Sequence, residues 1–413
     1  MSGPAVKGRG TVDAASRTAA IALAITLAIQ IFTAVAATAT SVLAPEIGRD
    51  LGIAPKLVGA FVGIVYAGSM AASLASGMFI EHHGPIRVSQ VCVLLCAAGL
   101  LTIGAGTAFT GTTIVVLALA PVIIGLGYGP ITPASSELLA RTASPSRMAL
   151  TFSIKQTGVP AGAALSGAVL PILALRFGWH VAFALIAAVG VGVAALSQVV
   201  RTSLDAGRTP ARAPSVGGFV GPLRELVRND AILELVSAAF VYAALQVCLV
   251  SFIVVYLTES LGYTLVAAGL VLTVANIAGV VGRIAWGGFA DFHLAPRALL
   301  GWLGIAAGGC AFVTAAFDTT WPLAAILVTS AVFGGTAIGW NGVMLSEVAR
   351  LAPANRVGAI TGASGFVTFG GVMIGPPVFA LISAVTGEYR HGFVTFGVLT
   401  VGCGVWLLAR RTK

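Results

Sequence analysis

Charged side chains are scarce in this sequence. Asp, Glu, Lys and Arg make up 9% of its 413 residues, whereas a soluble domain carries about 25%. Hydrophobic residues reach 58%, and the mean hydropathy is +1.00. This small number of charged residues cannot cover a folded surface that faces water. The composition therefore excludes a water-soluble globular protein.

Cysteine and histidine are also few, and their spacing matches no metal or redox site. The five cysteines fall in apolar stretches, without the paired spacing of metal ligands or the framework of a disulfide-rich domain. His82 and His83 are adjacent, so one helix face cannot present both. Nothing resembles a catalytic constellation or an ATP-binding domain. We therefore expect no metal, no cofactor and no enzyme activity.

A concentrated basic patch is missing as well. The net charge is +9, but the basic residues are spread over short loops instead of forming an arm or patch, so we expect no nucleic-acid partner. The run Gly125-x-Gly127-x-Gly129 lies inside an apolar stretch with no strand before it, so it does not predict a dinucleotide site.

Long apolar runs are what the sequence has in abundance. Runs of about 20 residues are long enough to cross a bilayer as helices. The first run follows Lys7, Arg9 and Arg17 and is longer than the core of a signal peptide, so we expect an uncleaved helix. The sequence predicts twelve spans, near 18–43, 56–79, 88–108, 112–136, 148–174, 180–200, 232–257, 264–289, 298–316, 321–346, 357–386 and 392–409.

The twelve predicted spans divide into two sets of six. Residues 201–230, rich in Arg, Pro and Gly, form the one long polar stretch, so we predict an N-terminal half over 1–200, a linker over 201–230 and a C-terminal half over 231–413. An internal repeat supports this division, because residues 59–87 align with 269–297 at an offset of 210. We therefore expect an all-α membrane protein with two pseudo-symmetric halves.

The distribution of Lys and Arg predicts the orientation in the membrane. With the N-terminus in the cytoplasm, cytoplasmic segments hold 17 of these residues and the opposite side holds four. Because cytoplasmic loops are enriched in positive charge, we expect both termini in the cytoplasm and a bacterial-type inner membrane. Two cations, Lys155 and Arg283, are left inside spans.

The segment Gly282-Arg283-x-x-x-Gly287-x-x-Ala290-Asp291, followed by Arg297, resembles the signature loop of the major facilitator superfamily. The resemblance covers essentially the whole chain, and it implies twelve helices and alternating access. In that family the glycine lets helices cross, and the acid holds a cytoplasmic gate. The repeat supplies a degenerate first copy, in which the gating residues are Gly77, Glu81 and Arg87.

Two Gly- and Pro-rich runs resemble the flexible gating segments of the same family. One contains Gly158 and Pro160 in the fifth span, and its counterpart in the eleventh span contains Gly375 and Pro376. The sequence departs from the family pattern at one position that bears on proton coupling. Pro121 stands where many proton-coupled members carry an arginine.

The two interior cations indicate the sign of the substrate. All 14 acidic residues fall in loops, tails or span ends, and an ionisable group costs about 2.5–3.5 kcal/mol in the hydrocarbon region. A small organic anion would balance the charge. The segment Lys155-Gln156-Thr157-Gly158, together with Arg283 four residues before Gly287, resembles the bacterial organic-anion and monocarboxylate branch, in which such an arginine binds the carboxylate. Lys155 and Arg283 could instead snorkel, or Arg283 could belong to the gate.

Polar and aromatic residues of the spans are candidates for the rest of the cavity wall. Tyr66 and Asn276 occupy equivalent repeat positions. The full set of substrate-binding candidates is Arg283, Lys155, Gln156, Tyr66, Asn276, Tyr128, Gln30, Tyr242, Gln246, Asn341 and Trp340.

The leading interpretation is a secondary transporter for a mono- or dicarboxylate, acting as a monomer among membrane lipids. Neither an interior acid nor an interior histidine is present, so we expect anion exchange or symport in which a proton accompanies the carboxylate. Efflux of amphipathic compounds is the alternative, although it would favour an interior acid. A transport-inactive sensor with the same fold would be expected to carry an added domain.

Overall fold

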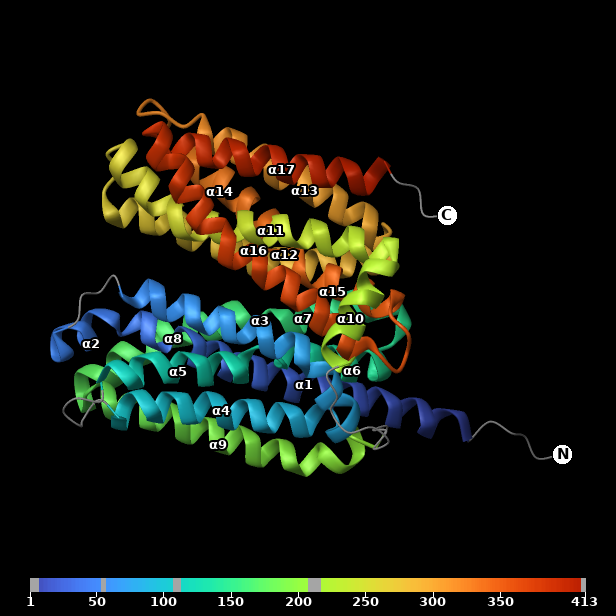
Figure 1. Ribbon diagram of the computed structural model, residues 1–413. Helices are drawn as coiled ribbons and strands as arrows, with labels where there is room; N and C mark the ends of the chain where they lie inside the picture. Colours follow the sequence, from blue (N-terminus) through green and yellow to red (C-terminus); the bar gives the residue numbers. More distant parts are fainter. Residues whose placement is uncertain (1–6, 53–56, 107–112, 207–216, 410–413) are drawn as a thin grey trace.

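The computed structural model describes residues 7–52, 57–106, 113–206 and 217–409, and these residues form helices joined by short loops (Figure 1). Twelve of the described helical segments are long and apolar enough to cross a membrane. The prediction of an all-α membrane protein with twelve spans is therefore confirmed. The segments are 16–42, 61–83, 85–105, 118–142, 145–177, 179–204, 230–260, 267–292, 296–315, 323–351, 357–386 and 389–409.

The first half of the described chain contains nine α-helices. They are α1 (Lys7–Val42), α2 (Ala44–Leu51), α3 (Leu57–His83), α4 (Pro85–Gly106), α5 (Thr113–Tyr128), α6 (Ile131–Thr142), α7 (Met148–Gln156), α8 (Gly158–Phe177) and α9 (Trp179–Leu204), with the 3₁₀ turn η1 (Pro145–Arg147) before α7.

The second half begins with α10 (Gly217–Arg228), which lies inside the predicted linker. The helices that follow are α11 (Asp230–Val255), α12 (Leu265–Phe292), α13 (Pro296–Ala315), α14 (Leu323–Ala337), α15 (Asn341–Leu351), α16 (Val357–Thr386) and α17 (Tyr389–Ala409), with the π-helical turn η2 (Tyr256–Ser260) extending α11.

The helices gather into two groups, α1–α9 and α11–α17 (Figure 1). The groups touch through α3, α6 and α7 on one side and α12, α15 and α16 on the other. Figure 1 shows the start of α1, the end of α17 and α10 at the same end of the molecule, where the groups converge; we call it the terminus end. Toward the other end the groups diverge.

Several predicted spans are broken helices instead of continuous ones. The fourth span is α5 followed by α6, the fifth is α7 followed by α8, and the tenth is α14 followed by α15. The breaks fall at 129–130, Thr157 and 338–340, beside glycine or proline. These residues weaken a helix because glycine adds backbone freedom and proline lacks an N–H.

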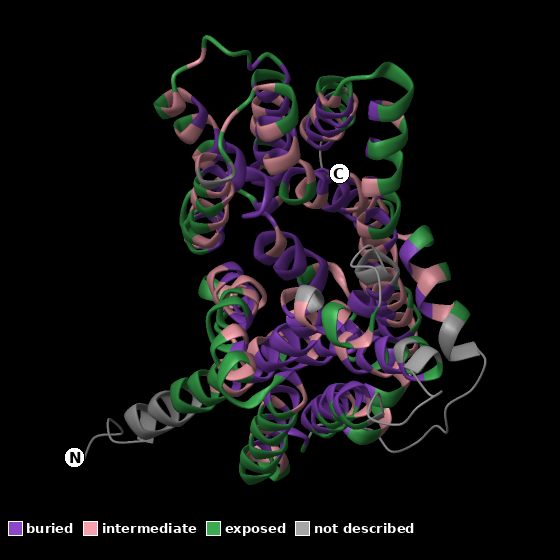
Figure 2. Ribbon diagram, turned by 90° about the vertical axis from the view of Figure 1, so that its left-hand side faces the viewer, coloured by how far each residue is buried: buried purple, intermediate pink, exposed green. Residues whose placement is uncertain are grey.

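The outward faces of the bundle are apolar. Figure 2 shows buried residues where helices face one another and exposed residues around the outside. Leu175, Val199 and Val385 are 84%, 81% and 78% exposed. Scattered apolar residues of this kind suit contact with lipid chains, where exposure carries no hydrophobic penalty.

Candidate substrate site and gate

Arg283 on α12 connects the two groups of helices. It is 3% exposed. Its Nε donates to the carbonyl oxygen of Ile338 at 3.0 Å, and its Nη1 donates to the carbonyl oxygen of Gln156 at 2.5 Å. No acidic side chain of the described residues forms an ion pair with it. The buried guanidinium is therefore positioned by neutral backbone oxygens, one from each half.

The sequence explains why those oxygens are free. In a continuous helix the carbonyl of Gln156 would accept the N–H of residue 160, but Pro160 has no N–H. Helix α7 ends at Gln156, and α8 begins at Gly158. Ile338 lies in the break between α14 and α15. Broken spans thus expose two carbonyls to the same cation, an arrangement seen at ion sites of transporters.

A cavity of about 150 Å³ lies beside Arg283, between the two halves. Arg283 is the charged residue of the described wall. Phe369 from α16 faces two tyrosines of the other half, with ring centroids 6.0 Å from Tyr66 and 6.3 Å from Tyr128. The remaining lining is a mixture of hydroxyl, amide and apolar groups. One cation in a partly aromatic pocket suits an anion with an apolar portion.

Seven of the eleven predicted substrate residues line this cavity. The amides of Asn341 and Gln246 meet at the wall, with Nδ2 donating to Oε1 at 3.1 Å. The Trp340 ring is fixed by a hydrogen bond from Nε1 to the carbonyl of Ala337 at 3.0 Å. The seven are Tyr66, Tyr128, Gln156, Gln246, Arg283, Trp340 and Asn341.

The other four candidates lie away from the cavity wall. Tyr242 packs edge-on against Trp340 and donates to the carbonyl of Leu300 at 3.0 Å. Asn276 bonds within its own helix, to the carbonyl of Leu272 at 2.9 Å. Gln30 and Lys155 are bonded to each other behind the wall.

Lys155 is 1% exposed, and neutral groups surround its ammonium. Nζ donates to Gln30 Oε1 at 2.6 Å and to Gln156 Oε1 at 3.1 Å, with Thr132 Oγ1 at 3.4 Å. Thr132 and Gln156 line the cavity, whereas Lys155 does not. The lysine thus lies one side chain behind the wall.

The cavity also contains residues absent from the predicted set, notably Ser73, Ser364, Thr132 and Phe369. The internal repeat could have pointed to two of them, Ser73 and Ser364. At the offset of 210, Ser73 corresponds to Arg283, and Ser364 corresponds within one residue to Lys155. Equivalent positions in the two halves could therefore have identified both serines. No comparable pattern marks Phe369.

At the terminus end, Asp291 joins the two halves. Its Oδ1 accepts the backbone N–H of Ala149 at 2.9 Å, and its Oδ2 accepts that of Leu150 at 2.8 Å. These donors belong to the first turn of α7, where N–H groups lack helical partners and a negative charge is favoured. Gly287 lies on the same face of α12, and a Cβ there would come 2.6 Å from the Cβ of Ser153. The predicted gate residues Gly287 and Asp291 thus meet α7.

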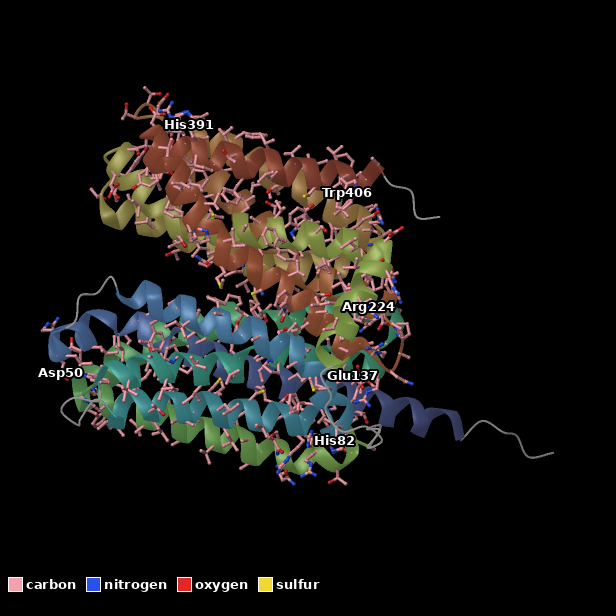
Figure 3. All side chains as sticks on the ribbon, in the orientation of Figure 1. Asp50, His82, Glu137, Arg224, His391 and Trp406 are labelled. Carbon is pink, nitrogen blue, oxygen red and sulfur yellow. The ribbon has the colours of Figure 1, made fainter. Side chains whose placement is uncertain are left out.

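The equivalent contact in the other half uses an unexpected acid. The repeat pairs Asp291 with Glu81, but Glu81 is exposed and bonds to no described residue. Instead, Glu137 on α6 accepts the N–H of Gly358, in the first turn of α16, at 2.7 Å. Figure 3 shows Glu137 at the terminus end, where the two halves meet. Gly77 lies in the same interface, where a Cβ would come 2.5 Å from Ala359.

The two predicted gate arginines bond within their own halves. Arg297 pairs with Glu234 and donates from Nε to the carbonyl of Leu407 at 3.1 Å. Arg87 contacts Gln90 at 3.3 Å. Arg297 therefore joins α13 to α11 and α17, whereas the Arg87 contact stays within α4.

An acid that sequence reasoning missed lies beside Arg87. Asp205 accepts the N–H groups of Ile86 at 2.8 Å and Arg87 at 3.1 Å, at the start of α4. Burial raises the pKa of Asp205, although these two hydrogen bonds oppose the rise. Gly84 precedes this turn with φ +89°, and a side chain there would meet Asp205.

The other predicted hinge residues lie in α8 and α16. A Cβ on Gly158 would come 3.0 Å from Gln30, and one on Gly375 would come 2.9 Å from Ala244. Both glycines therefore allow close helix packing. Pro376 lies inside α16, which continues through it to Thr386.

Comparison with known families gives one match over most of the chain. The model of the Major Facilitator Superfamily matches residues 26–371. A solved bacterial homologue of the iron transporter ferroportin, in an outward-facing state, superposes with a TM-score of 0.75 at 16% identity, covering 94% of this chain and 100% of that one. That likeness concerns the fold alone.

Three curated relatives carry different descriptions. A hexuronate transporter of Bacillus subtilis (strain 168) is 23% identical over 378 residues, covering 88% of this chain and 87% of the relative. Monocarboxylate transporter 13 of Bos taurus is 24% identical, covering 83% and 77%. An MFS-type efflux pump of Mycolicibacterium smegmatis (strain ATCC 700084 / mc(2)155) is 29% identical, covering 62% and 58%.

Proposed function

This chain belongs to the Major Facilitator Superfamily, and we propose that it is a secondary transporter that moves a small organic anion, a mono- or dicarboxylate, by alternating access. The observation that carries this proposal is Arg283, a buried cation at the cavity wall with no acidic partner among the described residues. An anion in the cavity would supply the missing charge.

The geometry of Arg283 suits a carboxylate. A guanidinium has five N–H donors, and two of the groups that carry them already bond to Ile338 and Gln156. The N–H groups of Nη2 and the second N–H of Nη1 remain available to a ligand. Two such donors in one plane match the two oxygens of a carboxylate. A lysine at this position could not offer that fork.

Two of the relatives named above support the anionic class. One is a hexuronate transporter and another is a monocarboxylate transporter. Both descriptions refer to organic acids, in agreement with a positively charged cavity.

Alternating access is supported by the arrangement of the contacts. The cavity lies between the halves, and the two capped helix starts, of α7 and α16, lie at the terminus end. Breaking these caps while closing the other end would expose the cavity to the opposite side. The charge bias in the sequence supports an orientation with the terminus end in the cytoplasm, and we propose an inner membrane as the location. One chain holds the whole cavity, so a monomer suffices.

Efflux of amphipathic compounds is the second candidate function. It is favoured by the aromatic group of Tyr66, Tyr128 and Phe369 and by the efflux-pump relative. Cationic amphipaths would meet an unfavourable charge at Arg283, so this candidate predicts binding of neutral or acidic compounds.

Thermal unfolding of the purified protein with added ligands tests the proposal, because a ligand that binds the folded state raises its apparent stability. The probes are D-glucuronate, L-lactate, benzoate, D-glucose and tetraphenylphosphonium. We expect at least one carboxylate to raise the Tm of the wild type, and neither the sugar nor the cation to do so. The increase should vanish in Arg283→Ala and most of it in Arg283→Lys.

A matched control is Arg176→Lys, since Arg176 lies near the end of α8 and outside the cavity wall. Its response to carboxylate should equal that of the wild type. Stabilisation by tetraphenylphosphonium or glucose, with no response to any carboxylate, contradicts the organic-anion proposal.

A further inference from the structure

We infer that Lys155 is a proton-binding site, separate from the substrate site at Arg283, and that its protonation couples anion transport to the movement of protons. The inference rests on the proposed function, since the anion at Arg283 is the partner that the proton balances. Lys155 is buried to 1% exposure behind the cavity wall, where a fixed charge needs a reason.

The partners of Lys155 suit both of its protonation states. An ammonium has three N–H donors, and three oxygens receive them, on Gln30, Gln156 and Thr132. A neutral amine has two N–H donors and one lone pair. Rotation of either amide would present an NH₂ to that lone pair, and the hydroxyl can also donate. A carboxylate beside Lys155 would instead stabilise only the ammonium form, so the lysine would keep its proton.

The charges around Lys155 supply the coupling. Helix α7 packs against α1, α6, α8, α12 and α15. From these helices Arg283 is the charged group that faces Lys155, because its Nη1 bonds to the carbonyl of Gln156, the next residue.

The other charged groups on those helices are engaged elsewhere or lie near helix ends. Asp291 and Glu137 bond to helix starts, Arg141 lies 3.9 Å from Glu137, and Glu347 pairs with Arg350 at 2.5 Å. Arg17 lies at the start of the membrane-spanning part of α1, and Arg176 lies near the end of α8.

The charge balance gives the order of events. With an empty cavity, Arg283 and a protonated Lys155 repel each other without a counter-charge, and loss of one proton relieves the repulsion. When a carboxylate binds Arg283, its negative charge favours the ammonium, so the Lys155 amine takes up one proton and forms one N–H bond. A monocarboxylate and a proton then cross together with no net charge.

A route for the proton exists at the wall. Thr132 and Gln156 face the cavity and also contact Nζ, so a proton passing between the lysine and cavity water crosses a single side chain. The cavity would thus deliver both the anion and the proton from the same side.

The direct test observes Lys155 itself. The sequence has four lysines, Lys7, Lys56, Lys155 and Lys413. Replacing the other three by arginine leaves one, whose Cε resonance in protein labelled with ¹³C-lysine distinguishes amine from ammonium. The carboxylate probe is whichever of D-glucuronate, L-lactate and benzoate raises the Tm most. We expect its addition to shift the resonance toward the ammonium form and to take up protons from a weakly buffered solution.

Transport by the variants gives a second readout. In proteoliposomes a gradient of one pH unit should drive up to about tenfold accumulation of a monocarboxylate, because about 1.4 kcal/mol corresponds to a factor of ten. Lys155→Arg, which stays charged, and Lys155→Gln, which stays neutral, should show no pH-driven accumulation while still exchanging labelled for unlabelled anion. A role in packing alone would lower both activities together.

The outcomes separate this inference from the proposed function. If a carboxylate binds the wild type without proton uptake and Lys155 stays in the ammonium form up to about pH 9, below the value of about 10.4 for an exposed lysine, the inference is wrong. If no carboxylate binds, the proposed function fails. Titration of Lys155 without ligand then tests the inference by itself. Conversion between ammonium and amine below about pH 9 supports a proton site, and an ammonium signal that stays constant up to that pH overturns it.

Discussion

Arg283 shows how a single proline can free a backbone carbonyl to hold a buried cation. Pro160 withholds one N–H, the carbonyl of Gln156 loses its helical donor, and the guanidinium from the other half takes its place. The arginine is therefore held in a defined orientation without an acid that would compete with an anionic ligand. A buried cation fixed by neutral oxygens keeps its charge for the proposed anionic substrate.

Two adjacent glycines on α12 allow a test of its contact with α7, because only one of them faces that helix. A Cβ on Gly287 would come 2.6 Å from the Cβ of Ser153, whereas one on Gly288 would meet nothing within 4 Å. We expect Gly287→Ala to destabilise the closed terminus end by about 1–3 kcal/mol, the usual cost of overpacking. Gly288→Ala should leave it closed.

The measurement for the glycine pair is the distance between spin labels at Ser146 and Ala354. Both residues are exposed, Ser146 in the 3₁₀ turn η1 before α7 and Ala354 in the loop before α16. The five native cysteines are first replaced. A longer distance is expected with Gly287→Ala alone, and equal distances in both variants would contradict the argument.

Residue type and depth along a span could be predicted from the sequence, but rotation about the helix axis could not. Of the candidate residues, Arg283, Gln156 and Tyr66 line the cavity, whereas Lys155 is turned behind the wall and Asn276 away from it. In a helix of a soluble protein, polar residues gather on the face toward water, so the sequence shows how the helix is rotated about its axis. Here both lipid and neighbouring helices accept apolar residues, so the pattern carries little information about which side faces the cavity.

At the scale of helices, the proposed gate consists of two capped helix starts. Asp291 binds the start of α7, and Glu137 binds the start of α16, each acid coming from the opposite half. The internal repeat predicts Glu81 in the second position. Glu81 lies on α3 and Glu137 on α6, and both helices pack against α16, so helix packing alone does not decide which acid reaches Gly358. The sequence therefore predicts that an acid should occur near this helix start, but not which one.

The two candidate acids in the first half provide a matched pair. Removing a helix cap costs about 0.5–2 kcal/mol, which corresponds to about a 2- to 30-fold change in the equilibrium between closed and open forms. We expect Glu137→Ala to shift the terminus end toward the open form by such a factor, and Glu81→Ala to shift it little.

The spin-label pair at Ser146 and Ala354 also reports this shift, as a change in the populations of short and long distances. Asp291→Ala should resemble Glu137→Ala. A larger effect of Glu81→Ala than of Glu137→Ala would restore the gate that the repeat predicts.

At the scale of the whole molecule, apolar length was enough to predict the fold. All twelve predicted runs correspond to helical segments that are long and apolar enough to span a bilayer, because a spanning segment must satisfy its own backbone hydrogen bonds. The breaks between α5 and α6 and between α14 and α15 were not predicted. Glycine and proline occur in many of these spans, and tertiary contacts decide which of them interrupt a helix.

The orientation of the molecule in the membrane can be tested with single cysteines. Ser203 lies near the end of α9 at the terminus end, and Glu388 lies in the loop before α17. With 17 basic residues predicted on the cytoplasmic side and four on the other, Ser203→Cys should react from inside the cell and Glu388→Cys from outside. Labelling of both from one side would contradict the predicted topology.

The contact between Arg283 and Gln156 lies at the far end of α7 from its cap. Helix α7 has nine residues, so at about 1.5 Å per residue the contact is roughly 13 Å from the gate. In the alternating-access cycle proposed above, a point at that depth would be the fulcrum of the rocking motion and would move least when the two ends open and close. An anion held there changes its surroundings more than its position. The membrane potential, about 2.3 kcal/mol per charge for 100 mV, then falls across whichever end is closed, so the ion crosses the electric field because the insulating barrier moves past it.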